Sequence, residues 1–253
     1  VWEDEEEEGE GENMMFRGNG VVFKLFRKYV EAYLPDYNDN LLSGWVVKFA
    51  SGENEEKEKE KEEEEDEKRG LINPYEVDIS NIKRHCNNIE NENDSIEDWI
   101  EEVRQTNLKN LEKSVKEVWE IITSSTESTP LSLRVLSRHL FLLANNSNVN
   151  PHNIVASFLF DRLWGPHIVF GKGRERDREK EKEKEKERER KAVERGLLLV
   201  GKVLGMVVHG VEAREEYLQP LNNVIKELSD GLPKFIDHLI DVESHLSSSS
   251  SSS

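Results

Sequence analysis

Apolar residues recur every three or four positions over most of this 253-residue chain, and this spacing most constrains its fold. The first stripe covers residues 21–34 and stops at Pro35. Two further stripes cover about 98–123 and the segment from near Pro130 to Asn145-Asn146. The next begins after a predicted Asn153 cap and covers 154 to about 164. The last three cover about 192–209, 219–228, and 232–242, with Pro233 in the first turn of the final helix. Residues 45–49 are too short to assign as strand or helix, and we find no convincing strand. The pattern predicts an all-α fold, a multi-helix bundle packed around one core.

The net charge of −18 is concentrated in two acidic tracts. Residues 3–12 carry eight acids, and residues 53–69 carry eleven acids against five bases. The remainder is near neutral, and the eleven bases of residues 172–191 are interleaved with eight acids. Because a nucleic-acid-binding face needs clustered, unneutralised bases, we expect no nucleic-acid partner.

Low-complexity segments set the expected boundaries. We divide the chain into an acidic segment at 1–13, a helical domain at 14–243 with insertions at 53–69 and 172–191, and a Ser-rich tail at 244–253. These tracts lack the apolar residues that would offset the entropy of ordering them, so we expect solvated loops. In the Lys-Glu alternation at 179–187, like charges four apart cancel the benefit of opposite charges three apart, which favours transient helix at most.

The sequence carries none of the short motifs of self-contained enzymes: there is no GxGxxG, no P-loop and no GxSxG. His139 and His152 are not at metal-ligand spacing, and His85-Cys86 is predicted to be an exposed loop pair. We therefore expect no metal and no cofactor. One cysteine excludes an internal disulfide and fits a reducing compartment, and no apolar run reaches the ~20 residues of a membrane helix. We expect a cytoplasmic protein, with any membrane recruitment left to other regions.

Four segments carry most of the functional signal: Phe16-Arg17-Gly18-Asn19, residues 158–166 around Phe160-Asp161-Arg162, residues 195–204, and residues 215–222. In this order and helical setting they resemble the later part of a Ras GTPase-activating (RasGAP) domain, with neurofibromin-like features. Tyr75-Glu76-Val77-Asp78 is a weaker match, similar to a Glu-Val-Asp stretch of the family. Glu194-Arg195-Gly196-Leu197, which overlaps the third segment, is close to the neurofibromin-like Glu-Arg-Gly-Leu.

The chain departs from the family pattern at several positions. Phe160 and Arg162 match the family's Phe-Leu-Arg, but Asp161 stands where the family has an apolar residue, and a buried unpaired carboxylate there would be costly. Gly165 and His167 depart in the turn that follows. Further departures are Gly205 and His209, where the family usually has Gln and Asn.

The resemblance implies an activator that is not itself an enzyme, acting on a Ras-family small GTPase in its GTP-bound form. It implies that Arg162 braces the loop of the arginine finger, and that the GTPase-contacting residues are Arg17, Arg162, Lys202, His209 and Asn222. We expect the contact groove between the helix carrying Arg162 and the helix carrying Lys202. The finger itself is expected before Val1, so we predict no catalytic residue within the chain.

Three functional hypotheses remain open at this stage. The first is an active RasGAP of which this chain is the C-terminal part, favoured by the retained Phe-Arg-Gly-Asn, Arg162 and Lys202. The second is a Ras-like GTPase-binding or scaffolding module whose catalytic function has decayed, favoured by the changes at Asp161, Gly165, Gly205 and His209. The third is a helical bundle with charged tethers and no GTPase partner.

Overall fold

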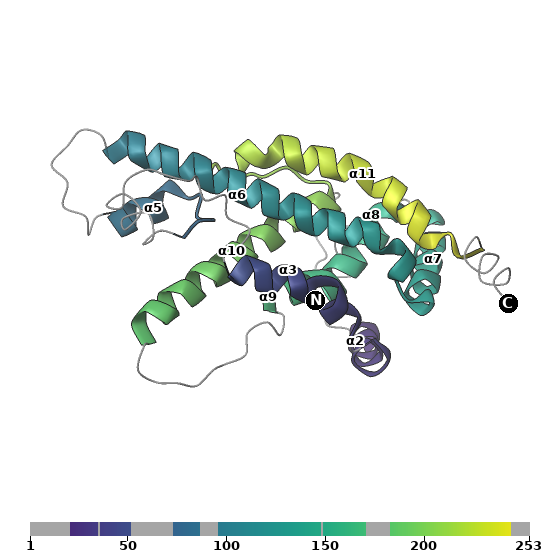
Figure 1. Cartoon of the computed structure of the whole chain (residues 1–253). Helices are drawn as coiled ribbons and strands as arrows, with labels where there is room; N and C mark the ends of the chain where they lie inside the picture. The colour runs from purple at the N-terminus through teal and green to yellow at the C-terminus, as the bar shows by residue number, and fades with distance from the viewer. Residues whose placement is uncertain are drawn as a thin grey trace, which may run out of the picture.

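The computed structural model describes residues 21–34, 36–51, 73–86, 96–147, 149–170 and 183–243. Within these ranges the chain is helical and contains no strand, as the apolar spacing predicts. The elements are α2 (Val21–Tyr33), α3 (Tyr37–Ala50), α5 (Ile79–Cys86), α6 (Ile96–Ser124), η1 (Ser125–Ser128), α7 (Leu131–Asn145), α8 (Pro151–Leu159), η2 (Phe160–Trp164), α9 (Gly165–Phe170), α10 (Glu183–His209), η3 (Gln219–Leu221) and α11 (Asn222–Ile240). Figure 1 shows the long helices α6 and α11 lying along one another, with α10 crossing behind them.

The C-terminal half of α10 is the centre of the bundle. Val200, Val203, Leu204 and Val207 have no exposed surface, and the helix packs against α6, α8, α9 and α11. A helix that is apolar nearly all round is stable only when it is surrounded by other elements. The position of α10 therefore determines where the neighbouring helices can lie.

Two glycines allow neighbouring elements to approach α10 closely. A Cβ atom at Gly196 would lie 2.8 Å from both the Phe49 ring and the Tyr75 ring. These two rings are stacked on each other, with centroids 4.2 Å apart. A Cβ atom at Gly201 would lie 2.8 Å from a methyl group of Val169 on α9. No larger residue fits at either position without moving its neighbours, so the glycines fix the spacing between α10 and the elements beside it.

The segment after α7 is helical for longer than the sequence predicts. Its cap is Asn150, whose side chain accepts a hydrogen bond from the backbone N–H of His152 at 3.0 Å, so the predicted Asn153 cap is wrong. The chain also does not leave the helix at Gly165-Pro166 but continues through the π-helical turn η2 into α9. The Gly165 N–H bonds the carbonyl of Phe160, and a Cβ atom on Gly165 would lie 2.9 Å from that oxygen. The wide turn and the glycine accommodate Pro166, which has no N–H to donate.

Residues 45–49, which the sequence left unassigned, belong to helix α3. Two other predictions about secondary structure are corrected. The predicted loop pair His85-Cys86 ends helix α5. Helix α10 begins at Glu183, so the loop predicted for 183–191 is wrong. Extending a helix that tertiary packing has already nucleated costs little, and Lys, Glu and Arg are good helix formers. The tract at 53–69, the acidic segment 1–13, Phe16-Arg17-Gly18-Asn19 and the tail 244–253 lie outside the described residues.

Helix α11 is one helix where the sequence predicts two. Pro233 lies inside it on the exposed side, while Leu232, Phe235 and Ile236 are buried against the core. The Phe235 ring lies near two tryptophans, with centroids 6.5 Å from Trp119 and 6.1 Å from Trp164. Burial of these side chains on both sides of the proline offsets the ~3 kcal/mol that proline costs inside a helix.

A buried arginine closes the end of α11. Arg134 of α7 is 2 % exposed, and its guanidinium donates to the backbone carbonyls of His238, Leu239 and Asp241 at 3.1, 3.0 and 2.8 Å. The last carbonyls of a helix have no intrahelical donor and carry the negative end of the helix dipole. Arg134 therefore satisfies acceptors that would otherwise be buried unpaired, and it joins α7 to α11.

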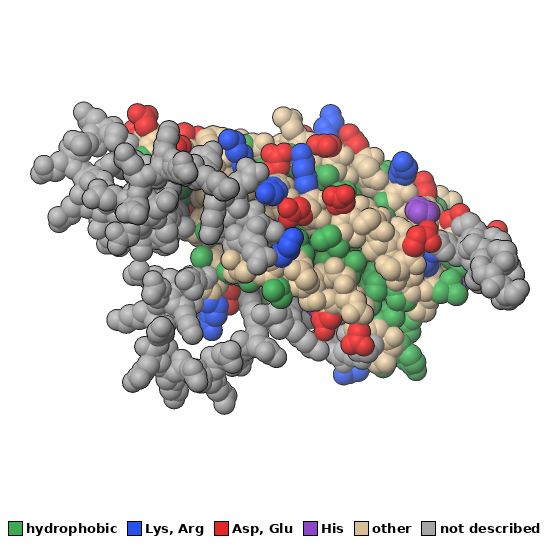
Figure 2. Space-filling view, in the orientation of Figure 1, with side chains coloured by type: hydrophobic (Ala, Val, Ile, Leu, Met, Phe, Trp, Pro, Cys, Tyr) green, Lys and Arg blue, Asp and Glu red, His purple; other side chains and the backbone are tan. Residues whose placement is uncertain are grey.

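The surface is mixed in character. Figure 2 shows acidic and basic side chains interspersed over the face formed by α6 and α11. Hydrophobic side chains gather toward α7 in the same view, and the exposed residues of α7 include Leu131, Leu142 and Leu143. Among the described residues no helix combines the length and the apolar character needed to cross a membrane.

We predict that Arg134→Met lowers the free energy of unfolding by about 3 kcal/mol, because three carbonyls at the end of α11 lose a charged donor. Urea denaturation measures this loss. Arg138→Met is the matched control, since Arg138 also joins α7 to the end of α11 but through an exposed ion pair with Glu243 at 2.9 Å. The control should change stability by less than about 1 kcal/mol. Equal losses in the two variants would contradict the capping role of Arg134.

We predict opposite effects for two glycine-to-alanine substitutions within helices. Gly196→Ala should destabilise the domain, because its Cβ atom would clash with the Phe49 and Tyr75 rings at 2.8 Å. Gly44→Ala, whose Cβ atom meets nothing within 4 Å, should stabilise α3 by about 0.5–1 kcal/mol through helix propensity. Thermal unfolding of both variants checks the pair. Stabilisation by Gly196→Ala would show that α10 and its neighbours can separate at low cost.

Candidate functional site

Helix α10 leaves only a narrow stripe of its C-terminal half accessible. The stripe consists of Leu198, Lys202, Gly205, Met206 and His209. These residues are spaced three or four positions apart, so they lie on one face of the helix, and the other residues between Gly196 and Val208 are buried. Leu198 is 47 % exposed, and the other four are half-buried. Two of the predicted contact residues, Lys202 and His209, therefore share one face of one helix. We refer to these five residues as the α10 stripe.

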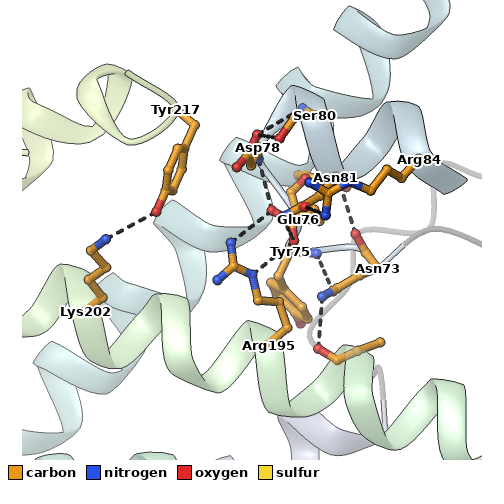
Figure 3. Close-up of polar contacts among 12 residues, drawn as sticks. Asn73, Tyr75, Glu76, Asp78, Ser80, Asn81, Arg84, Arg195, Lys202 and Tyr217 are labelled. Carbon is orange, nitrogen blue, oxygen red and sulfur yellow. Dashed lines mark hydrogen bonds and ion pairs between the residues drawn. The ribbon is translucent and has the colours of Figure 1, made fainter. Parts of the chain in front are cut away.

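Lys202 is held by the loop that follows α10. Its ammonium donates to Glu215 Oε1 at 2.6 Å and to the Tyr217 hydroxyl at 3.2 Å, and it lies 5.5 Å from the centre of the Tyr217 ring. Figure 3 shows Lys202 pointing toward the Tyr217 hydroxyl. Burial lowers the pKa of Lys202, but hydrogen bonds to Glu215 and Tyr217 outweigh it, so the pKa lies above its ordinary value. The hydrogen bond from Lys202 lowers the pKa of Glu215.

The end of α10 has the geometry of a Schellman motif. Gly210 adopts φ +65°, its N–H bonds the carbonyl of Val207 at 3.3 Å, and the Val211 N–H bonds the carbonyl of Met206 at 3.1 Å. Only glycine adopts this left-handed backbone without strain. The motif ends the helix at His209 and turns the chain into the segment that carries Glu215.

Asn222 also fixes this loop. Its side-chain oxygen accepts a hydrogen bond from the backbone N–H of Ala213 at 2.8 Å, across nine residues of chain. Asn222 is half-buried at the start of α11, so it braces the loop between α10 and α11. The structure thus gives Asn222 a positioning role toward Glu215, and its contact with a GTPase stays a prediction.

His209 connects α10 to the segment that carries Arg162. Its Nδ1 lies 3.0 Å from Ser157 Oγ on α8, and its Nε2 lies 3.5 Å from Asp161 Oδ1 on η2. Asp161 is exposed and pairs with a histidine of a neighbouring helix, so the cost of a buried unpaired carboxylate does not arise at this position. Two of the departures from the family pattern, Asp161 and His209, therefore contact each other.

Arg162 follows Asp161 in η2 and is half-buried. It lies on the segment that His209 joins to α10, and its contact with a GTPase stays a prediction. Arg17 lies outside the described residues. The site residues that the structure describes thus divide into a pair on the α10 stripe, an arginine on the adjoining η2 turn and an asparagine that braces the following loop.

The sequence analysis did not predict an ion pair at the other end of the core-packed part of α10. Arg195 donates through Nε to Glu76 Oε2 at 3.0 Å and through Nη2 to Glu76 Oε1 at 3.3 Å, a fork-to-fork pair (Figure 3). Glu76 is buried and also accepts from the Asp78 N–H and from the Asn81 amide. Asn107 of α6 donates to the carbonyl of Glu76 at 2.7 Å. The signal was present in the sequence, because Glu76 belongs to the Glu-Val-Asp match and Arg195 to the Glu-Arg-Gly-Leu match.

This contact joins the Glu-Val-Asp match, which contains Glu76, to the Glu-Arg-Gly-Leu match, which contains Arg195. Arg195 immediately precedes Gly196, which packs against Tyr75, so the ion pair and the close packing lie at the same corner. Burial lowers the pKa of Arg195, but the hydrogen bonds and charge of Glu76 outweigh it, and the guanidinium stays charged. A buried carboxylate with four side-chain or backbone donors is well satisfied. The corner therefore fixes the start of the buried part of α10.

Among the described residues, no group of three or more histidine, cysteine, aspartate or glutamate side chains is arranged to hold a metal ion. The ion pairs around α10 instead join one helix to its neighbours.

The comparison with protein families gives one match. The family described as GTPase-activator protein for Ras-like GTPase (RasGAP) matches residues 2–209. The match ends at His209, the last residue of α10, so Glu215, Tyr217 and Asn222 lie beyond it. A search of curated proteins finds no match.

We predict that the Lys202–Glu215 ion pair stabilises the domain in a pH-dependent manner. The raised pKa of Lys202 means that its contribution is present below the ordinary lysine value of 10.5 and is lost as the pH rises through the folded-state pKa. The lowered pKa of Glu215 means that its contribution is present above the ordinary value of 4.5 and is lost as the pH falls through the folded-state pKa. The coupling should therefore be fully present between these two ordinary values.

A double-mutant cycle with Lys202→Met and Glu215→Gln measures this coupling as a difference in unfolding free energy. We expect about 0.5–1 kcal/mol at neutral pH, since the pair is partly exposed, and less as the pH falls through the pKa of Glu215. Lys83 and Glu97, which are exposed and 3.8 Å apart, form the control pair with coupling near zero. Coupling that does not change with pH would contradict the assignment.

Proposed function

Because this chain belongs to the RasGAP family of GTPase-activator proteins for Ras-like GTPases, we propose that it binds a GTP-loaded Ras-like GTPase and stimulates that GTPase's hydrolysis of GTP. The observation that carries the proposal is the α10 stripe beside η2. His209, at the end of the stripe, contacts Asp161 on the segment of Arg162, and Lys202 lies on the same face of the C-terminal half of α10. The proposed GTPase-binding face consists of the stripe and the exposed part of η2.

The chemistry of activation lies in the GTPase. Ras-like GTPases hydrolyse GTP slowly because charge that develops on the phosphates is poorly neutralised, and an inserted arginine accelerates the reaction by about 10³–10⁵. We propose that this chain contributes the surface that positions the GTPase, with Arg162 bracing the loop of the finger.

A specific observation favours a second candidate, a GTPase-binding module that does not accelerate hydrolysis. Lys202 is already engaged by Glu215 and Tyr217, and Gly205 offers no side chain to a partner. His209 is likewise engaged by Ser157 and Asp161. The polar groups of this face already form hydrogen bonds and ion pairs within the chain. Such a face can bind a GTPase without rearranging the catalytic groups of the GTPase.

The test separates binding from catalysis. A panel of Ras-like GTPases is loaded with a non-hydrolysable GTP analogue for binding and with GTP for single-turnover hydrolysis. The chain is added as it stands and, in parallel, as a version extended upstream. Acceleration by either version supports the activator, and binding without acceleration supports the second candidate. A folded chain that neither binds nor accelerates any member of the panel would overturn both and leave the bundle without a GTPase partner.

We predict that Lys202→Glu weakens binding to the GTP-loaded GTPase about tenfold, or about 1.4 kcal/mol, because it reverses a charge on the proposed face. Lys234→Glu, an exposed lysine on α11, is the control for the same change in net charge and should leave the affinity unchanged. Calorimetric titration measures both. An unchanged affinity for Lys202→Glu would remove Lys202 from the binding face.

A charge swap distinguishes direct contact from an effect through the loop. Lys202→Glu combined with Glu215→Lys restores an ion pair between α10 and the loop but leaves a negative charge at position 202. If Lys202 contacts the GTPase, binding stays weak in the double variant. If Lys202 acts only by holding the loop, binding recovers.

A further inference from the structure

Asp161 is an exposed carboxylate at the junction of η2 and α10. Its side chain is 40 % exposed, and the described ion pair is the 3.5 Å approach of one oxygen to His209 Nε2. Because a carboxylate offers two oxygens and several acceptor directions, a single imidazole at this distance leaves most of its capacity unused. Asp161 can therefore accept hydrogen bonds from outside the chain.

Ser157 and Asp161 together orient the His209 ring. A carboxylate can only accept, so the Nε2 that faces Asp161 carries the hydrogen, and in the neutral ring Nδ1 accepts from the Ser157 hydroxyl at 3.0 Å. Ser157 and Asp161 are four residues apart on continuous helix, so they lie on one face and hold the ring from two points. The ring in turn holds the carboxylate at the edge of the α10 stripe.

Gly205 leaves the neighbouring surface without a side chain. It lies one helical turn before His209, is half-buried, and a Cβ atom there would meet only the Phe160 ring, at the ordinary contact distance of 3.7 Å. A small side chain would therefore fit, and none is present. The stripe therefore has a gap at position 205, that is, a position without a side chain next to the Phe160 ring.

The charges around this gap favour a cation. Lys202 on one side forms an ion pair with Glu215 at 2.6 Å, which reduces its repulsion of a second cation. Asp161 on the other side supplies a negative charge. The gap thus places a position without a side chain beside an acceptor for a positive group.

We propose that a lysine or arginine side chain of the Ras-like GTPase lies over Gly205 and pairs with Asp161. This inference rests on the proposed function and adds a specificity-determining residue to it. GTPases with a basic residue at the facing position are bound, and those with an acidic or apolar residue there are bound more weakly, because the Asp161 carboxylate is then desolvated without a partner. Asp161 and Gly205, which would select GTPases by the charge of the facing residue, are both positions at which this chain departs from the family pattern.

The first test is Asp161→Asn, which removes the charge and keeps the shape. Binding of the full chain to a GTPase loaded with a non-hydrolysable GTP analogue should weaken about tenfold, the effect of losing one charge-assisted hydrogen bond. Asp237→Asn is the matched control, because Asp237 is also exposed and pairs with a histidine, His152, at 2.8 Å, but at the junction of α8 and α11. The control should keep wild-type affinity, and both variants should keep the wild-type melting temperature.

Gly205→Leu tests the gap independently. It should weaken binding by a similar factor, whereas Gly205→Ala, whose methyl group only reaches ordinary contact distance, should be better tolerated. Asp161→Arg is then titrated against single Lys→Glu and Arg→Glu variants of the GTPase surface. Recovery of affinity with one of them identifies the facing residue and supports the proposal, and recovery with none overturns it.

The outcomes separate the two proposals. A folded wild-type chain that binds no Ras-like GTPase overturns the proposed function and this inference together. Wild-type binding with equal affinity for Asp161→Asn overturns this inference alone, and leaves the proposed function in place.

Discussion

The structure depends on how closely its neighbours can approach α10. Gly196 and Gly201 have no side chains where Phe49, Tyr75 and Val169 come nearest, and a single Cβ atom at either position would lie 2.8 Å from its neighbour. Because the core is densely packed, an added side-chain atom at one of these contacts would displace the elements on both sides of it. The narrow accessible stripe is a consequence, since α10 is enclosed by α6, α8, α9 and α11 wherever they can reach it.

Periodicity alone predicted the helical class and most of the helices, because burial against one core selects apolar residues at helical spacing. It did not predict the continuity of the helices. Gly165-Pro166 and Pro233 are usual signals for a helix end, but here a π turn and the burial of Phe235 carry the helix past them. The charged residues 183–191 have no apolar pattern of their own, and their helix extends one that the core already stabilises.

The resemblance supplied candidate site positions and said nothing of their contacts. In the structure Lys202 and His209 lie on α10 and Arg162 lies on η2, and the contact of these residues with a GTPase stays a prediction. Sequence spacing carries no information on which side chains meet across a bundle. The pairs Lys202–Glu215, Asp161–His209 and Glu76–Arg195 therefore became visible only in three dimensions.

The π turn η2 has a consequence for how this segment can change. A π turn holds one residue more than the α-helical turn it replaces, so it shifts the phase of the helix by about 100°. Deleting one residue between Phe160 and Trp164 would regularise the hydrogen bonds and at the same time rotate α8 relative to α9. Either Asp161 would leave the edge of α10 or Trp164 would leave the core. The segment should therefore accept substitutions at its exposed positions far more readily than any change in its length.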